Sequence, residues 1–161
     1  AGHGTYEEDA KRGYWLPIDA TKETTADWIS NAEITDKLRA IKARHVMVVA
    51  DSCYSGTLTR GIHVSKKSND YLNRMAKKRS RTVLTSGGFE PVIDGGSGDH
   101  SIFAKSFLNA LLQNTDIIDA TILFDNLRRE VILNAQQTPQ YSDLRMAGHE
   151  GGDFLFVRRK E

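Results

Sequence analysis

The chain has 161 residues, 39% hydrophobic and 27% charged, with 13 Gly and 3 Pro, which excludes disordered and collagen-like classes and predicts a single domain over residues 1–161. Lys and Arg total 22 against 21 Asp and Glu, so no global charge favours nucleic acid or an anionic membrane as partner. The longest apolar run, residues 46–50, is far shorter than the ~20 residues that span a bilayer, and we expect a soluble, cytoplasmic protein.

Helical and strand-like patterns alternate along the chain. Helical spacing of apolar residues is found at residues 34–41, 71–75, 102–111 and 123–131. Ser30 or Asn31 can cap the first of these helices. Short β-branched or apolar runs typical of strands are found at residues 45–50, 82–86 and 154–157. The alternation predicts an α/β fold, with a sheet covered by helices on both faces.

The chain opens on Gly2-His3-Gly4, with no Met and no strand before it. His-Gly is typical of a loop at the carboxyl end of a strand, where α/β proteins place their sites. The recognisable strands number about three or four, against a typical ~5 to 6 in a sheet. We therefore expect that N-terminal strands of the sheet are missing from this sequence.

The single cysteine, Cys53, lies in the segment ADSCYSG at residues 50–56, directly after the predicted strand. It is either a buried small apolar residue or a reactive thiol, and its place on a turn at a strand end favours reactivity. His3 is the candidate base that would promote the thiolate. The backbone N–H groups of Gly4 and Cys53 could stabilise an oxyanion, which indicates acyl transfer. The other histidines lie in no such motif: His45, His63, His100 and His149.

The motifs GHG at residues 2–4 and DSCYSG at residues 51–56 resemble the His–Cys dyad of caspase-like cysteine peptidases of family C14, clan CD, nearest to the metacaspases and bacterial caspase-like proteins. Four further segments match in the family's order: GYWLPID at 13–19, LTSGG at 84–88, GDHSIFA at 98–104 and QTPQY at 137–141. The resemblance covers essentially the whole chain. It implies a three-layer sandwich whose mostly parallel sheet is flanked by helices.

The resemblance also assigns roles within the site. It implies that Cys53 is the nucleophile, that His3 is the general base or acid, that the amides of Gly4 and Cys53 bind the oxyanion, and that no third triad member exists. Asp51 shares a face with Cys53 on an extended backbone and would pair with a cationic substrate side chain. This predicts cleavage after Arg or Lys, with Arg preferred. The alternative for Asp51 is a strand-end residue that bonds local amides.

Three further residues are candidates for the substrate pocket. Ser86 follows the next strand and is a pocket wall by resemblance. Glu90 and Asp94 lie on a glycine-containing loop and could add negative charge.

A metal site is not expected, although many metacaspases need calcium. The acids nearest the histidine, Glu7-Glu8-Asp9, are adjacent and lack the alternating spacing of a compact calcium loop. No clustered His and Cys residues suggest zinc. The dyad chemistry itself requires no cofactor.

A basic segment over residues 60–82 carries the acid Asp70 and eight basic residues: Arg60, Lys66, Lys67, Arg74, Lys77, Lys78, Arg79 and Arg81. Such a run is most often a solvated helix face and loop. It could also be cut during maturation, with Arg60, Lys66 and Lys67 as sites of self-cleavage. Nucleic-acid binding is a third interpretation, weakened because Tyr71 is the one interleaved aromatic residue.

The sequence thus predicts a cysteine endopeptidase that acts after basic residues, activated by proteolytic processing or by a sensor or regulatory protein. Its expected partners are proteins or peptides with exposed Arg or Lys, and it is expected to act as a monomer. The alternative is a caspase-like pseudo-enzyme that serves as a scaffold or regulatory binding module. Retention of both His3 and Cys53 favours the enzyme.

Overall fold

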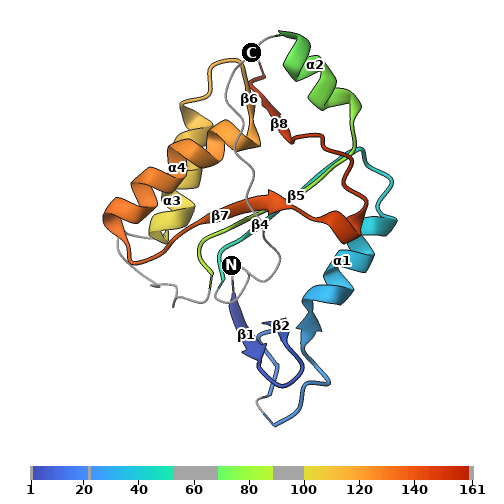
Figure 1. Ribbon diagram of the computed structural model, residues 1–161. Helices are drawn as coiled ribbons and strands as arrows, with labels where there is room; N and C mark the ends of the chain where they lie inside the picture. Colours follow the sequence, from blue (N-terminus) through green and yellow to red (C-terminus); the bar gives the residue numbers. More distant parts are fainter. Residues whose placement is uncertain (1, 22, 53–68, 89–99, 160–161) are drawn as a thin grey trace.

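A computed structural model describes residues 2–21, 23–52, 69–88 and 100–159 (Figure 1). The helices are α1 (Asn31–Ala40), α2 (Asn69–Lys77), α3 (Ile102–Leu112) and α4 (Ala120–Asn134), with a short 3-10 turn, η2 (Arg145–Ala147). The strands are β1 (His3–Glu7), β2 (Arg12–Leu16), β3 (Ile29–Ser30), β4 (His45–Ala50), β5 (Ser80–Thr85), β6 (Ile117–Asp119), β7 (Gln140–Asp143) and β8 (Leu155–Val157). None of the helices within these ranges is long and apolar enough to cross a membrane.

The strands form three small sheets. In the central sheet, of order β4-β5-β7, the pair β4–β5 is parallel and β7 runs antiparallel to β5. The strands β1, β2 and β3 form an antiparallel sheet, and β6 pairs antiparallel with β8. The predicted α/β class is confirmed. The pairing is more mixed than expected, because β4–β5 is the one parallel pair within the described ranges.

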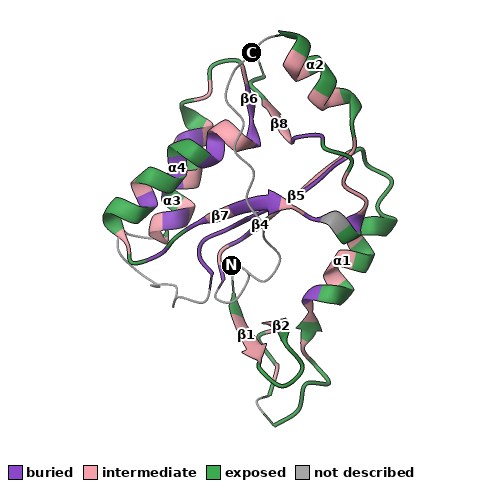
Figure 2. Ribbon diagram, viewed as in Figure 1, coloured by how far each residue is buried: buried purple, intermediate pink, exposed green. Residues whose placement is uncertain are grey.

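The central strand β5 is buried along its whole length and has core on both faces. Leu84 belongs to the larger apolar cluster, which is built mainly from α3 and α4. Its neighbour Val83 belongs to a smaller cluster with Leu144 and Ala147, against which Leu38 of α1 packs. Successive side chains of a strand point to opposite faces, so the sheet has helices on both sides, as predicted. Figure 2 shows the buried residues concentrated along this sheet and on the inner sides of α3 and α4.

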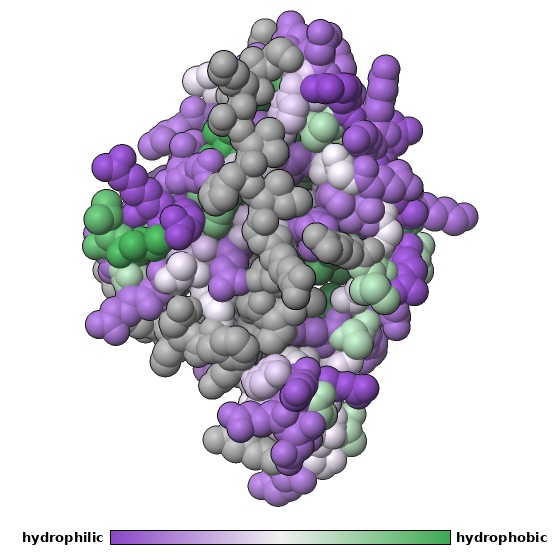
Figure 3. All heavy atoms as spheres, in the orientation of Figure 1, coloured by the Kyte–Doolittle hydropathy of each residue, from purple (hydrophilic) through white to green (hydrophobic). Residues whose placement is uncertain are grey.

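Most of the face seen in Figure 3 is hydrophilic. Apolar side chains gather at its left edge, over the C-terminal end of α4, where Ile132 and Leu133 are exposed.

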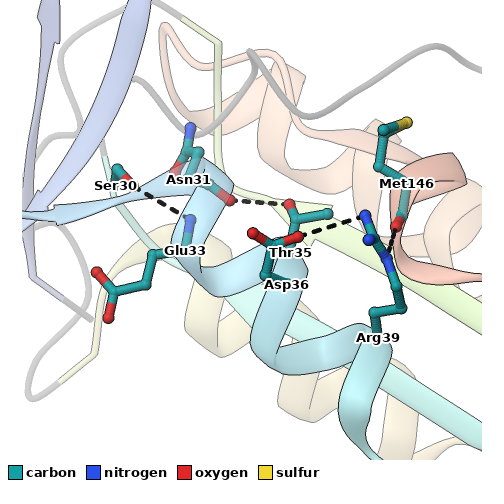
Figure 4. Close-up of polar contacts among 7 residues, drawn as sticks. All are labelled: Ser30, Asn31, Glu33, Thr35, Asp36, Arg39 and Met146. Atoms are coloured by element: carbon teal, nitrogen blue, oxygen red, sulfur yellow. Dashed lines mark hydrogen bonds and ion pairs between the residues drawn. The ribbon is translucent and has the colours of Figure 1, made fainter.

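Local side-chain contacts hold α1 at both ends (Figure 4). The hydroxyl of Ser30 accepts a hydrogen bond from the Glu33 amide at 3.1 Å, which confirms the predicted cap. Near the other end, Arg39 Nε donates to the carbonyl of Met146 at 2.6 Å. This bond joins α1 to η2, although the two residues are 107 positions apart in the sequence.

Arg81 is fully buried, which overturns the solvated-face interpretation of the basic segment at this residue. A guanidinium has five N–H donors, and here all five donate to backbone carbonyls. The acceptors are Leu38 (from Nε, 3.2 Å), Ile41 and Ala43 (from Nη2, 2.7 and 2.8 Å), and Arg44 and Ser80 (from Nη1, 3.1 and 2.8 Å). Burial lowers the pKa of Arg81, and neighbouring Arg79 lowers it further.

Four of these carbonyls lie at the end of α1 and in the connection to β4, and the fifth, that of Ser80, begins β5. The last carbonyls of a helix have no partner within the helix and carry partial negative charge. Arg81 supplies donors to them and joins α1, the α1–β4 connection and β5 in one cluster.

Replacing Arg81 should therefore destabilise the fold strongly. We expect Arg81→Met to lower the free energy of unfolding by about 3 kcal/mol or more, because the five hydrogen bonds from the charged guanidinium are lost. Arg81→Lys, with three donors, should have an intermediate effect. Denaturant unfolding measures both, with Arg128→Met, at an exposed position of α4, as a control that should change stability by less than about 0.5 kcal/mol. An Arg81→Met variant as stable as this control would contradict the prediction.

Candidate active site

A cavity of about 270 Å³ lies between the first antiparallel sheet and the carboxyl end of β4. It is lined by Gly2, His3, Trp15, Leu16, Pro17, Ile29, Val49, Ala50, Asp51 and Ser52. The start of β1 lies close to the carboxyl end of β4 (Figure 1). A hydrogen bond from the Gly2 amide to the Asp51 carbonyl, at 3.3 Å, joins the two segments. The cavity therefore unites parts of the two motifs that the sequence singled out.

His3 is exposed and begins β1, where it pairs with Leu16. The sequence suggested a loop at a strand end, and the difference arises because residues 3–7 pair with β2 in a hairpin. This antiparallel pairing was not visible from hydrophobic periodicity. Gly4 lies opposite Trp15 in the same ladder and is half-buried.

Cys53 lies outside the described residues, as does its amide, the second expected oxyanion donor. Its neighbour Ser52 is buried and lines the cavity. The structure thus brings His3 to the same cavity as the residue that directly precedes the cysteine.

Asp51 lines the cavity, and its carboxylate is bonded by a residue that lies outside the DSCYSG motif. Its Oδ2 accepts a hydrogen bond of 2.5 Å from the hydroxyl of Ser101. The other carboxylate oxygen, Oδ1, is buried and has no hydrogen-bond partner in the described part of the chain. The donor in this hydrogen bond is a hydroxyl fifty residues away in sequence, whereas the alternative interpretation of Asp51 expected local backbone amides.

Ser101 is a site residue that the sequence analysis missed. It is the N-cap of α3 and accepts a hydrogen bond from the Ala104 amide at 2.9 Å. A serine directly before a helical pattern is a capping signal. That signal says nothing about Asp51, because the contact depends on the tertiary arrangement.

The hairpin sheet contributes apolar side chains to the cavity lining. Trp15 lies between Gly4 and Ile29 in the ladder. Its indole N–H donates to Asn31 Oδ1 at 2.8 Å, which orients the ring. A cavity lined by apolar side chains and a carboxylate suits a side chain with an aliphatic stem and a cationic end.

Ser86, predicted as a wall of the pocket, does not line this cavity. Ser86 is fully buried, its amide donates to the Ala50 carbonyl at 3.0 Å, and it is not among the lining residues. Five candidates lie outside the described residues: Arg60, Lys66, Lys67, Glu90 and Asp94.

The described residues contain no group of three or more His, Cys, Asp or Glu side chains placed to hold a metal ion. Of the three acids near His3, Glu7 accepts a hydrogen bond from the Tyr14 hydroxyl at 3.2 Å. Glu8 and Asp9 are exposed between β1 and β2.

A second, smaller cavity of about 100 Å³ lies beside β7 and includes Tyr71, Tyr141 and Asp153 in its lining. Asp153 is buried, and accepts hydrogen bonds from the Tyr141 hydroxyl and from the hydroxyl of Thr121, the latter at 2.8 Å. Burial raises the pKa of Tyr141, and Asp153 raises it further. Burial likewise raises the pKa of Tyr71 to about 12, with smaller contributions from Asp119 and Asp153. These groups form a buried polar network that fixes α4 to β7.

The comparisons with known proteins agree with the sequence motifs. The family model described as the caspase domain, Peptidase_C14, matches residues 1–148. None of the curated proteins compared matches the chain.

The raised tyrosine pKa values predict a loss of stability in alkali. Tyr71 ionises near pH 10 in the unfolded chain and at about pH 12 in the folded one. The contribution of Tyr71 to the free energy of unfolding is complete below pH 10. It is lost as the pH rises toward 12, because only the unfolded state then releases the proton. We expect Tyr71→Phe to show a shallower loss of unfolding free energy between pH 10 and 12, measured by urea unfolding. Equal slopes for the variant and the wild type would contradict this.

Proposed function

This chain belongs to the caspase-domain family of peptidases, Peptidase_C14, and on that premise we propose that it is a cysteine endopeptidase that hydrolyses peptide bonds after basic residues through His3 and Cys53. The single observation that carries the proposal is the shared cavity. His3 and the segment that ends one residue before Cys53 line one space of about 270 Å³.

In the proposed reaction, His3 accepts the thiol proton of Cys53, and the thiolate attacks the substrate carbonyl carbon. The oxyanion that forms is stabilised by the amides of Gly4 and Cys53. His3 then donates its proton to the leaving amine as the C–N bond breaks, which leaves a thioester. Water, deprotonated by His3, attacks this thioester and releases the acid and the free thiol.

Specificity for a basic residue rests on Asp51. Its carboxylate lines the cavity, and one of its oxygens is buried without a described donor. A buried acceptor without a donor costs about 1–3 kcal/mol, and a substrate cation would supply the donor. Arg is preferred over Lys because a planar guanidinium presents several N–H donors in a fixed geometry. Glu90 and Asp94 remain candidates for further negative charge at this pocket.

The physiological substrates in this proposal are cytoplasmic proteins or peptides that present exposed Arg or Lys, cleaved by a monomer without a required cofactor. Proteolytic processing or a sensor protein would switch the enzyme on.

Hydrolysis of fluorogenic peptides that end in Arg, Lys or Asp tests the proposal. We expect the wild type to cleave after Arg and, more slowly, after Lys, equally with calcium or a chelator. Cys53→Ala and His3→Ala should each lower kcat/KM by at least about a thousandfold. His100→Ala, at another exposed histidine, should retain activity. Cleavage after Asp would overturn the specificity, and activity retained in Cys53→Ala would overturn the nucleophile.

Self-cleavage in the basic segment is a separate expectation. If the pocket takes basic residues, incubated wild type should be cut after Arg60, Lys66 or Lys67, and Cys53→Ala should stay intact. Arg81 should not be cut in the folded protein, because its side chain and backbone are buried in β5. Mass spectrometry of the fragments identifies the bonds. Cuts in the Cys53→Ala variant would show a contaminating protease instead.

A further inference from the structure

The contact between Ser101 and Asp51 brings the start of α3 to the candidate substrate pocket. Ser101 Oγ lies 2.5 Å from Asp51 Oδ2 and 2.9 Å from the Ala104 amide nitrogen. A hydroxyl has one proton and two lone pairs. Because the helix amide occupies a lone pair and the carboxylate can only accept when ionised, the hydroxyl proton points to Asp51.

This arrangement leaves the two oxygens of Asp51 unequal. Oδ2 is engaged by Ser101, whereas Oδ1 is buried without a hydrogen-bond partner in the described residues. A carboxylate with one oxygen held has a fixed plane, so the direction of the other oxygen is fixed as well. The Gly2 amide, bonded to the Asp51 carbonyl, fixes the backbone of the same residue.

The start of α3 also favours the negative charge. The first amides of a helix carry partial positive charge, and Ser101 transmits it because its Oγ accepts from one such amide while its proton is donated onward. A hydrogen bond to a charged group is stronger than one between neutral groups.

We propose that Ser101 is a positioning residue for substrate specificity, which orients the Asp51 carboxylate so that Oδ1 receives the guanidinium of a substrate arginine. This inference rests on the proposed function, because it assigns Asp51 to the substrate cation. Ser101, the N-cap of α3, then acts on the pocket through Asp51 and does not itself touch the substrate.

The test compares binding of N-acetyl-arginine amide with that of its neutral analogue N-acetyl-citrulline amide, by calorimetry or NMR titration. Binding does not require catalysis, so a latent enzyme still gives a result. The wild type should prefer the arginine ligand by about tenfold or more, and Asp51→Asn should remove the preference. Ser101→Gly should lower the preference toward the Asp51→Asn value, by about five- to tenfold. Ser101→Thr, which retains the hydroxyl, should restore it.

A control separates positioning from helix capping. Ser30 caps α1 with the same hydroxyl-to-amide bond, at 3.1 Å to Glu33. Gly replaces a serine cap at a cost of only a few tenths of a kcal/mol, so Ser30→Gly should match Ser101→Gly in thermal stability yet keep the wild-type ratio. A general loss of folding would weaken both ligands equally and leave the ratio unchanged.

The outcomes are distinguishable. Equal ratios for the wild type and Asp51→Asn, or no binding of either ligand to the wild type, would overturn the proposed pocket and this inference with it. A collapsed ratio in Asp51→Asn with a wild-type ratio in Ser101→Gly would overturn the positioning role alone and leave the pocket standing. A reduced ratio in Ser101→Gly that Ser101→Thr restores supports the positioning role.

Discussion

The buried guanidinium of Arg81 is the contact on which the arrangement of the first half of the described fold depends. Its five donors meet five carbonyls, four of which lie between the end of α1 and the start of β4. The last carbonyls of a helix have no partner within the helix. One side chain of β5 satisfies them, so α1 can end against the sheet and β4 can start beside β5 in parallel register.

That register determines where the candidate site is formed. β4 and β5 run in parallel from His45↔Ser80 to Ala50↔Thr85, and their carboxyl ends meet at one edge. The Ser86 amide bonds the Ala50 carbonyl at that edge, at 3.0 Å, which holds the start of the segment leading to Cys53. Ser86 therefore supports the site through its backbone while its side chain stays buried.

Three elements distant in sequence meet at Asp51. The hairpin sheet supplies His3 and an apolar wall, β4 supplies the carboxylate, and the start of α3 supplies Ser101. Each element is placed by a separate physical cause. His3 is placed by the pairing of β1 with β2, Asp51 by its position at the end of a parallel strand, and Ser101 by its role as a helix cap whose hydroxyl proton is free to bond Asp51. In the proposed enzyme, this arrangement combines a nucleophile, a base and a charge-selective pocket within one small space.

The sequence by itself determined the α/β class, the course of the helices and of β4 and β5, a helix cap at Ser30 or Asn31, and the two motifs that meet at the cavity. These features depend on local periodicity, capping and residue order, which are readable along the chain. Only the tertiary structure decided that His3 begins a hairpin strand, that Arg81 is buried while belonging to a basic run, and that Ser101 holds Asp51. Each of these depends on partners between about ten and fifty residues away, and no local pattern records which distant carbonyl, strand or carboxylate a side chain will meet.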